Sequence, residues 1–369
     1  MDNCVIPHGY KATALGIIPQ EWEVMLLGNL SNSISSGRNK HRDAHGQYPV
    51  FGSTGIIGYS STYEYEGPVI LVARVGANAG TLNFASGQYD VSDNTLIITI
   101  KQNVYDYNFA YNQLTHYKLN KLVFGSGQPL ITSKQLKNIR IPVPPLAEQR
   151  KIAEVLGVWD KAIEKQARLI EKLALRKRAL MQRLLSAKLR LPGFSEPWKK
   201  VKLGDVAELY QPQTIQSEDL SQTGYPVYDA NGLIGYYNNY NHEYPQVVIT
   251  CRGSSCGTVN FTPGKCWITG NAMVLNVDNN RDVNKSFFYY LISNSSFVNL
   301  ISGSGQPQIV RQPLLKFELR IPPLKEQTAI AEVLTAADRE IDLAKEKLER
   351  LRRQKRGLMQ QLLTGKKRI

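Results

Sequence analysis

The sequence predicts an α+β protein built from two similar halves, each a mixed α/β domain followed by a long helix. Three observations support this. A six-residue motif, PPLAEQ at 144–149 and PPLKEQ at 322–327, occurs twice, 178 positions apart. The residues after each motif have the apolar spacing of a coiled-coil helix, and those before it form short β-branched runs separated by glycine. Repetition of all three features indicates an internal duplication.

The two motifs also mark the predicted domain boundaries. We expect a first domain over residues 1–143, a first helix over 144–190, a second domain over 191–321 and a second helix over 322–369. With 369 residues and 42% hydrophobic content, the chain is long enough for each domain to have its own core.

Within each domain, short runs rich in valine, isoleucine and aromatic residues predict strands. The clearest hairpin covers residues 69–84, with a glycine-containing turn, and its counterpart covers 247–261. On this basis we match Arg74 with Arg252, each at the end of a strand before the turn. A small twisted sheet in each domain follows from these runs.

Each long helix has apolar residues at alternating spacings of four and three, which is the seam of a coiled coil. Proline is tolerated in the first helical turn because the N–H that it lacks would have no partner there, and the helix dipole favours the glutamate that follows. The positions assigned to helix pairing are Ile152, Leu156, Ile163, Ile170, Leu173, Lys177, Leu180 and Leu184 in the first helix, and Ile330, Leu334, Ile341, Leu348, Leu351, Lys355, Leu358 and Leu362 in the second.

Lys177 and Lys355 are a polar position that both seams share. A polar residue in a seam typically fixes the helix register at a cost in stability, so replacing both lysines by leucine is expected to raise thermal stability. The alternative is that each lysine extends outward to solvent.

The net charge of +14 indicates nucleic acid or an acidic partner. Residues 146–190 contain 12 Lys or Arg against 5 acidic residues, and 324–369 contain 12 against 7, so the helical parts hold +7 and +5. If DNA is the ligand, the nearly neutral domains must read it largely through neutral polar contacts. The alternative is an ordinary solvated coiled-coil surface.

The N-terminal residues lack the features of a signal peptide, and no apolar run approaches the roughly 18 residues of a membrane span. We therefore expect a cytoplasmic protein without a membrane partner. The four cysteines, Cys4, Cys251, Cys256 and Cys266, are too few for a disulfide framework and are expected to be reduced thiols. With His242 nearby, their spacing is not a common zinc pattern, so no metal site is expected.

The order of domain, motif helix, domain and motif helix resembles the specificity subunit of type I restriction-modification systems. The resemblance covers nearly the whole chain and implies two target-recognition domains, each reading half of a split, asymmetric site in double-stranded DNA. It also implies that the two helices pair antiparallel and give the chain an internal pseudo-twofold repeat. The segments that carry it are GSGQP at 125–129 and 303–307, PPLxEQ at 144–149 and 322–327, and AEVL at 153–156 and 331–334.

The resemblance implies partners as well. Two methyltransferase (M) subunits, which hold S-adenosylmethionine, would dock on the helices, and restriction (R) subunits are a further partner in systems that cleave. ATP and magnesium are expected only on partner subunits, and no cofactor is expected on this chain. The sequence has no GxxxxGK[ST] loop and no Asn-Pro-Pro-aromatic site, so we expect a non-catalytic subunit.

The candidates for DNA contact are polar and aromatic residues near the glycine-containing turns. An arginine at a strand end can fork onto guanine or a phosphate, and short polar side chains can reach base edges. Alternatively, the arginines pair within their own domains and the others are ordinary turn residues. The candidates are Arg74, Asn78, Tyr48 and Gln128 in the first domain, and Arg252, Ser254, Tyr225 and Gln306 in the second.

Two other functions compete with this interpretation. A coiled-coil protein scaffold without DNA specificity would explain the helices but not two divergent domains. A stand-alone DNA-modifying enzyme would need a catalytic signature that the sequence lacks.

The duplication also makes a prediction about the chain ends. Residues 191–198, which connect the first helix to the second domain, have a weak counterpart at 15–22. We therefore expect the end of the second helix near Thr364 to lie beside the first domain, as Ser186 lies beside the second.

Overall fold

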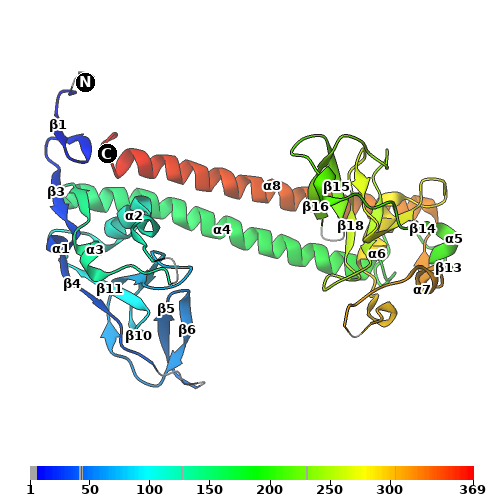
Figure 1. The fold of residues 1–369 in the computed structure, drawn as a ribbon, viewed down its shortest axis with the longest axis horizontal. Helices are drawn as coiled ribbons and strands as arrows, with labels where there is room; N and C mark the ends of the chain where they lie inside the picture. Colours follow the sequence, from blue (N-terminus) through cyan, green and yellow to red (C-terminus); the bar gives the residue numbers. More distant parts are fainter. Residues whose placement is uncertain (1–5, 41–42, 44, 126–127, 230–231, 304) are drawn as a thin grey trace. The chain divides into compact units, whose positions relative to one another are not determined.

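The computed structural model describes residues 6–40, 43, 45–125, 128–229, 232–303 and 305–369 (Figure 1). Its contacts divide the chain into two compact units. Unit 1 contains residues 1–167 and 347–369, and unit 2 contains residues 168–346. Each unit therefore holds one globular domain together with part of each long helix.

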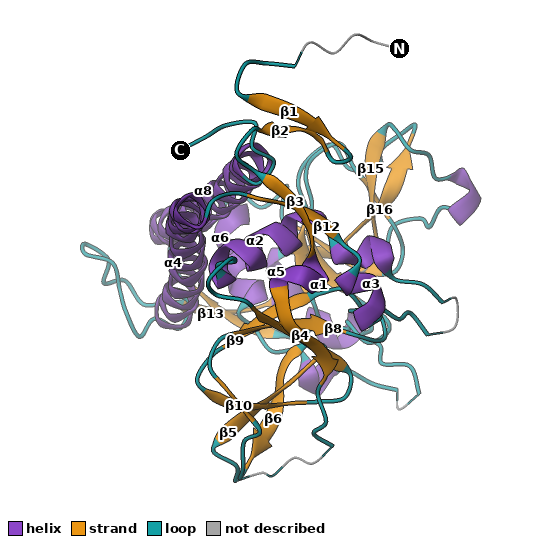
Figure 2. Cartoon of the chain, turned by 90° about the vertical axis from the view of Figure 1, so that its left-hand side faces the viewer, coloured by secondary structure: helices purple, strands orange, loops and turns teal. Residues whose placement is uncertain are grey.

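Unit 1 contains two four-stranded sheets, which Figure 2 shows one above the other. The first is antiparallel throughout and has the order β4 (Ser31–Ser36), β11 (Thr95–Ile100), β8 (Val69–Ala73) and β9 (Leu82–Ala85). The second has the order β6 (Gly55–Ser60), β5 (Tyr48–Gly52), β10 (Gln88–Val91) and β7 (Tyr65–Glu66). In this sheet β5 and β10 are parallel, and the other pairs are antiparallel.

Two small sheets and three short helices complete this domain. The sheets pair β1 (Tyr10–Thr13) with β2 (Gly16–Pro19), and β3 (Glu23–Leu26) with β12 (Arg140–Val143). The helices are α1 (Leu27–Leu30), α2 (Tyr107–Tyr117) and α3 (Ser133–Lys137), with a 3₁₀ turn at Leu119–Leu122. Asp106 begins α2 as its N-cap, because its carboxylate accepts a hydrogen bond from the amide of Phe109.

Unit 2 repeats most of this topology, with three described strands in place of four in its second sheet. Its antiparallel sheet has the order β14 (Glu208–Tyr210), β20 (Ala272–Asn276), β17 (Val247–Thr250) and β18 (Val259–Phe261). A second sheet has the order β16 (Gly232–Tyr237), β15 (Tyr225–Asp229) and β19 (Trp267–Ile268), with β15 and β19 parallel. The remaining elements are β13 (Lys199–Lys202) paired with β21 (Glu318–Ile321), α5 (Leu203–Val206), α6 (Lys285–Ser293), α7 (Arg311–Leu315), and 3₁₀ turns at Ser217–Asp219 and Val298–Leu300. Corresponding strands therefore have the same order and direction in both units, even where the two sequences have diverged.

The two long helices are α4 (Leu146–Leu184) and α8 (Leu324–Leu362), which lie side by side in Figure 1. In unit 1 the first half of α4 shares a core with the last half of α8, including Ile152 and Leu362. In unit 2 the last half of α4 packs on the first half of α8, where Leu173 contacts Ile341. Within each unit the helices thus run antiparallel, as the resemblance implied. All the assigned seam positions are buried or half-buried.

The end of α8 lies against the beginning of the domain in unit 1. Leu362 and Leu363 share a core with Trp22, and a Cβ on Gly365 would lie 2.3 Å from Cδ of Pro19. Both views show the β1–β2 hairpin beside this end of α8 (Figures 1 and 2). In unit 2 the end of α4 has the same relation to its domain, since Leu184 lies in that core. The prediction drawn from residues 15–22 is confirmed. No helix in the described part of the chain is both long and apolar enough to cross a lipid bilayer.

The glutamate of each PPLxEQ motif is buried and joins the start of one helix to the segment that follows the other. In unit 1 Glu148 accepts hydrogen bonds from Nε1 of Trp22 at 3.0 Å and from Nε of Arg368 at 2.7 Å. In unit 2 Glu326 accepts two from Arg190, at 2.6 and 2.7 Å. A buried carboxylate is tolerated because each has a guanidinium partner.

The glutamine of each motif joins the helix to its own domain through backbone atoms. Gln149 accepts a hydrogen bond from the amide of Asp106 at 2.8 Å and donates to the carbonyls of Val104 and Pro144. Gln327 makes the three equivalent bonds in unit 2, with the amide of Asn284 and the carbonyls of Asp282 and Pro322. Both glutamines are almost fully buried, so each holds the loop before α2 or α6 against the helix start.

The shared seam lysines form ion pairs between the helices. Nζ of Lys177 lies 2.5 Å from Oδ1 of Asp338, and Nζ of Lys355 lies 2.6 Å from Oδ1 of Asp160. Lys177 also lies over the ring of Tyr290, 5.3 Å from its centroid, and the Tyr290 hydroxyl donates to Asp338. The lysines are therefore charge-paired, which removes the reason for expecting leucine to raise stability at both positions.

We expect Gln149→Leu to lower the free energy of unfolding of unit 1 by about 3 kcal/mol, because leucine leaves one buried carbonyl and a partly buried amide and carbonyl without a partner. Hydrogen exchange read by mass spectrometry should show faster exchange in α2 and the loop before it. Gln327→Leu is the matched control, and it should accelerate hydrogen exchange in α6 and the loop before it instead. Equal acceleration of both units by either substitution would contradict this local role.

We expect Lys177→Leu and Lys355→Leu to differ. Lys177→Leu should lower the free energy of unfolding by about 1 kcal/mol, because it removes an ion pair and a cation–π contact together. Lys355→Leu should change it by less than about 0.5 kcal/mol, because Asp160 is more than half exposed and water can solvate it. Urea denaturation of both variants measures the difference. A larger loss for Lys355→Leu would show that the Tyr290 contact contributes nothing.

Candidate nucleic-acid interface

In unit 1, two of the loops that carry candidate residues meet at one edge of the antiparallel sheet. The loop after β8 contains Arg74 and Asn78, and the amide of Gly76 in this loop donates to the carbonyl of Pro129 at 2.9 Å. Pro129 follows Gln128 in the GSGQP segment. The structure thus brings together residues that lie about fifty positions apart in the chain.

The same convergence occurs in unit 2. The amide of Gly253 donates to the carbonyl of Pro307 at 3.1 Å, which joins the loop of Arg252 and Ser254 to the segment of Gln306. Gly253 has a φ of +82°, a conformation that favours glycine. Of the two GSGQP segments, Ser126, Gly127 and Ser304 lie outside the described residues. We call the two sets of converging loops the loop edge of unit 1 and the loop edge of unit 2.

The structure corrects one match made from the sequence. The amide of Arg74 donates to the carbonyl of Asn94, and the equivalent bond in unit 2 runs from Cys251 to Asn271. Arg74 therefore corresponds to Cys251, and Arg252 lies one position further along the loop. The prediction that the two arginines occupy the same place is wrong, because the repeat offset is 177 in this sheet and 178 in the motif helices.

Both arginines are available for a ligand. Arg252 is exposed and Arg74 is half-buried, and neither guanidinium has a hydrogen-bond or ion-pair partner among the described residues. The alternative in which each arginine pairs within its own domain is thus not seen in the described chain. Asn78, Ser254, Gln128 and Gln306 are exposed.

Tyr48 and Tyr225 do not belong to the loop edges. They begin β5 and β15, about 13 Å along the strand from the strand end that adjoins the edge. Each packs on a second tyrosine, Tyr63 and Tyr240 respectively, with ring centroids 4.8 Å apart in both units. The repeated pair gives each of these tyrosines a packing contact in the second sheet, and their contact with DNA stays a prediction.

Asp229 at the end of β15 lies next to the loop edge of unit 2, although sequence reasoning did not select it. It accepts hydrogen bonds from the hydroxyl of Thr269 and from Nδ2 of Asn271. Asn271 is the residue whose carbonyl accepts from Cys251, directly before Arg252. The available signal was the difference between the repeats, since Gly52 stands at this position in unit 1.

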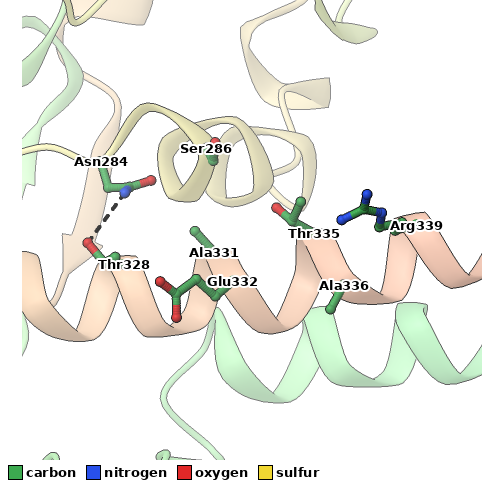
Figure 3. A pocket seen from close by; sticks show the side chains of 8 residues that line it. All are labelled: Asn284, Ser286, Thr328, Ala331, Glu332, Thr335, Ala336 and Arg339. Atoms are coloured by element: carbon green, nitrogen blue, oxygen red, sulfur yellow. Dashed lines mark hydrogen bonds between the residues drawn. The ribbon is translucent and has the colours of Figure 1, made fainter.

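A groove lies between α6 and α8 in unit 2 and has a volume of about 420 Å³ (Figure 3). At one end Nδ2 of Asn284 donates to Oγ1 of Thr328. Unit 1 has an equivalent groove of about 680 Å³ between α2 and α4. The residues that correspond in the two grooves include Ala153 with Ala331, Glu154 with Glu332, and Lys161 with Arg339.

The cysteines and His242 are explained by packing. Cys251 and Cys266 are buried in separate cores, and burial raises the pKa of the Cys251 thiol to about 11. The ring nitrogens of His242 lie 3.0 Å from the Tyr210 hydroxyl and 2.6 Å from Oδ1 of Asn241, and burial lowers its pKa. Within the described ranges, no group of three or more His, Cys, Asp or Glu side chains is arranged to hold a metal. Cys4 lies outside these ranges.

Comparison with known proteins gives one consistent family. The model of the type I restriction modification DNA specificity domain matches the chain twice, over residues 19–174 and 195–353. The type I restriction enzyme MjaVIII specificity subunit of Methanocaldococcus jannaschii is 24% identical, over 95% of this chain and 94% of its own length. The putative MjaX specificity subunit of the same organism is 26% identical, over 98% and 97%.

The fold agrees with this family. The crystal structure of the type I restriction-modification system S subunit from M. genitalium matches with a TM-score of 0.65 and 19% identity, covering 93% of this chain and 96% of that one. The chain therefore belongs to the type I restriction-modification specificity family, and it carries the DNA specificity domain of that family twice.

Proposed function

We propose that the chain is a non-catalytic subunit that directs a type I methyltransferase to a bipartite, asymmetric site in double-stranded DNA. Each loop edge reads one half of this site. The observation that carries the proposal is that the two edges share one backbone arrangement but present different side chains in the loops after β8 and β17. Two DNA-binding edges with the same backbone and different side chains suit a target whose two halves differ in sequence.

The side chains of the loop edges suit base reading more than phosphate binding alone. A guanidinium can donate two parallel hydrogen bonds to guanine, and an asparagine can pair in the same way with adenine. Arg74 and Asn78 in unit 1 and Arg252 in unit 2 supply such groups, without partners for either guanidinium in the described chain. Much of the sequence-independent attraction to DNA then comes from the basic helical parts of the chain.

The repeated groove suits two copies of one partner. Its alanine and its glutamate are identical in both units, whereas the loops after β8 and β17 have diverged. We assign the grooves to two methyltransferase subunits, one in each. S-adenosylmethionine, ATP and magnesium are then held by partner subunits, and restriction subunits join the assembly where the system cleaves DNA.

Arg74→Ala and Arg252→Ala should each relax the base preference in a different half of the target. Loss of a bidentate arginine contact costs about 1–3 kcal/mol, which is roughly a 5- to 150-fold loss of discrimination at that position. Sequencing that detects methylated bases, in cells that hold the intact complex, measures the preference directly. Arg353→Ala, an exposed arginine of α8, is the control and should leave the motif unchanged. If each substitution altered both halves, the assignment of one half to each unit would be wrong.

Glu154→Lys and Glu332→Lys should each remove one methyltransferase subunit from the complex, because the reversed charge enters a groove that already holds a cation. The double variant should bind none. Native mass spectrometry of the complex counts the subunits, and Glu171→Lys, an exposed position of α4 outside both grooves, is the control. Two bound subunits in the double variant would place the docking site elsewhere on the chain.

A further inference from the structure

Asp229 stands at the loop edge of unit 2 in a fixed orientation. It is half-buried, and its two carboxylate oxygens accept from Thr269 and, at 3.4 Å, from Asn271. The Asn271 carbonyl accepts from the amide of Cys251 at 3.0 Å, which places this carboxylate beside the loop of Arg252. A carboxylate has about four acceptor positions, so two remain for a ligand.

Unit 1 shows that the fold does not require this carboxylate. Gly52 ends β5 and pairs with Gly55, just as Asp229 ends β15 and pairs with Gly232, and both hairpins have an irregularity at the same place. In unit 1 the space beside this residue is apolar, because a Cβ on Gly52 would lie 2.6 Å from Cδ1 of Ile57. Asp229 is therefore an addition to a framework that forms without it.

The charge of Asp229 also needs an explanation. Within the described residues no lysine or arginine pairs with it, although the chain has a net charge of +14. The phosphates of DNA repel a carboxylate, so a carboxylate at a DNA-binding edge is favourable where it accepts a hydrogen bond from a base. In the major groove the bases that offer a donor are cytosine, through its N4 amine, and adenine, through its N6 amine.

We propose that Asp229 is a specificity-determining residue that accepts a hydrogen bond from the exocyclic amine of a base. At one base pair in the half-site of unit 2, this carboxylate then recognises which strand carries the cytosine or adenine. Thr269 and Asn271 act as positioning residues, since they hold the carboxylate. The inference rests on the proposed function, because it assumes that the loop edge of unit 2 faces the bases.

The test maps the methylated motif of the intact complex for the wild-type chain, Asp229→Gly and Asp229→Asn. Glycine is the residue that unit 1 uses here, so the hairpin should fold. Asp229→Gly should relax one position about tenfold within the half that Arg252→Ala also affects, and should leave the other half unchanged. Asp229→Asn, whose amide both donates and accepts, should admit guanine or thymine at that position. Glu218→Ala, an exposed carboxylate elsewhere in unit 2, is the control.

The outcomes separate the inference from the proposed function. The base pair whose preference the variants relax identifies the amine, as adenine at an A·T pair or cytosine at a G·C pair. A wild-type complex that methylates no defined motif would refute the proposed function. A clear motif that both variants leave unchanged would refute the role of Asp229 and leave the function intact. If circular dichroism shows that Asp229→Gly does not fold, the base preference of the near-isosteric Asp229→Asn variant decides whether Asp229 has this role.

Discussion

Both units depend on the hydrogen bonds that the buried glutamate and glutamine make at the start of each long helix. Glu148 holds Arg368 and Trp22, and Gln149 holds the loop before α2. The surrounding core is apolar, and apolar packing alone has little directional preference. These hydrogen bonds therefore fix the orientation of the domain on the helix, and a buried polar group that lost its partner would be costly.

Much of the fold could be predicted from the sequence because its signals are local. The seam spacing, the proline pair and the glycine turns each involve neighbouring residues, and the duplication allows every signal to be checked against its copy. The role of Gln149 could not be predicted, because its partner amide belongs to Asp106, far away in the chain. The match of Arg74 with Arg252 failed for a related reason. Two identical residues suggested an alignment, but strand pairing decides the register, and a shift of one residue turns a side chain to the other face.

The candidate site was predictable in its residue types but not in its assembly. Arginine, asparagine and glutamine near glycine turns were visible in the sequence, whereas the meeting of the two loops depends on backbone bonds such as that from Gly76 to Pro129. Asp229 was not predicted because the candidates were chosen at positions that match between the repeats, and this position is glycine in unit 1. In a duplicated protein, shared residues report on the fold, and the differences report on what each copy recognises.

The bonds of Gln327 carry a consequence for how this protein can change. All three of its hydrogen bonds end on backbone atoms, those of Asp282, Asn284 and Pro322. Because the Gln327 side chain bonds to the backbone of the domain and not to its side chains, a domain of quite different sequence can be attached to the same helix, provided that its backbone follows the same path. Genetic exchange of residues 191–321, between the end of α4 and the start of α8, would thus replace one whole domain in a single event while both long helices stay as they are.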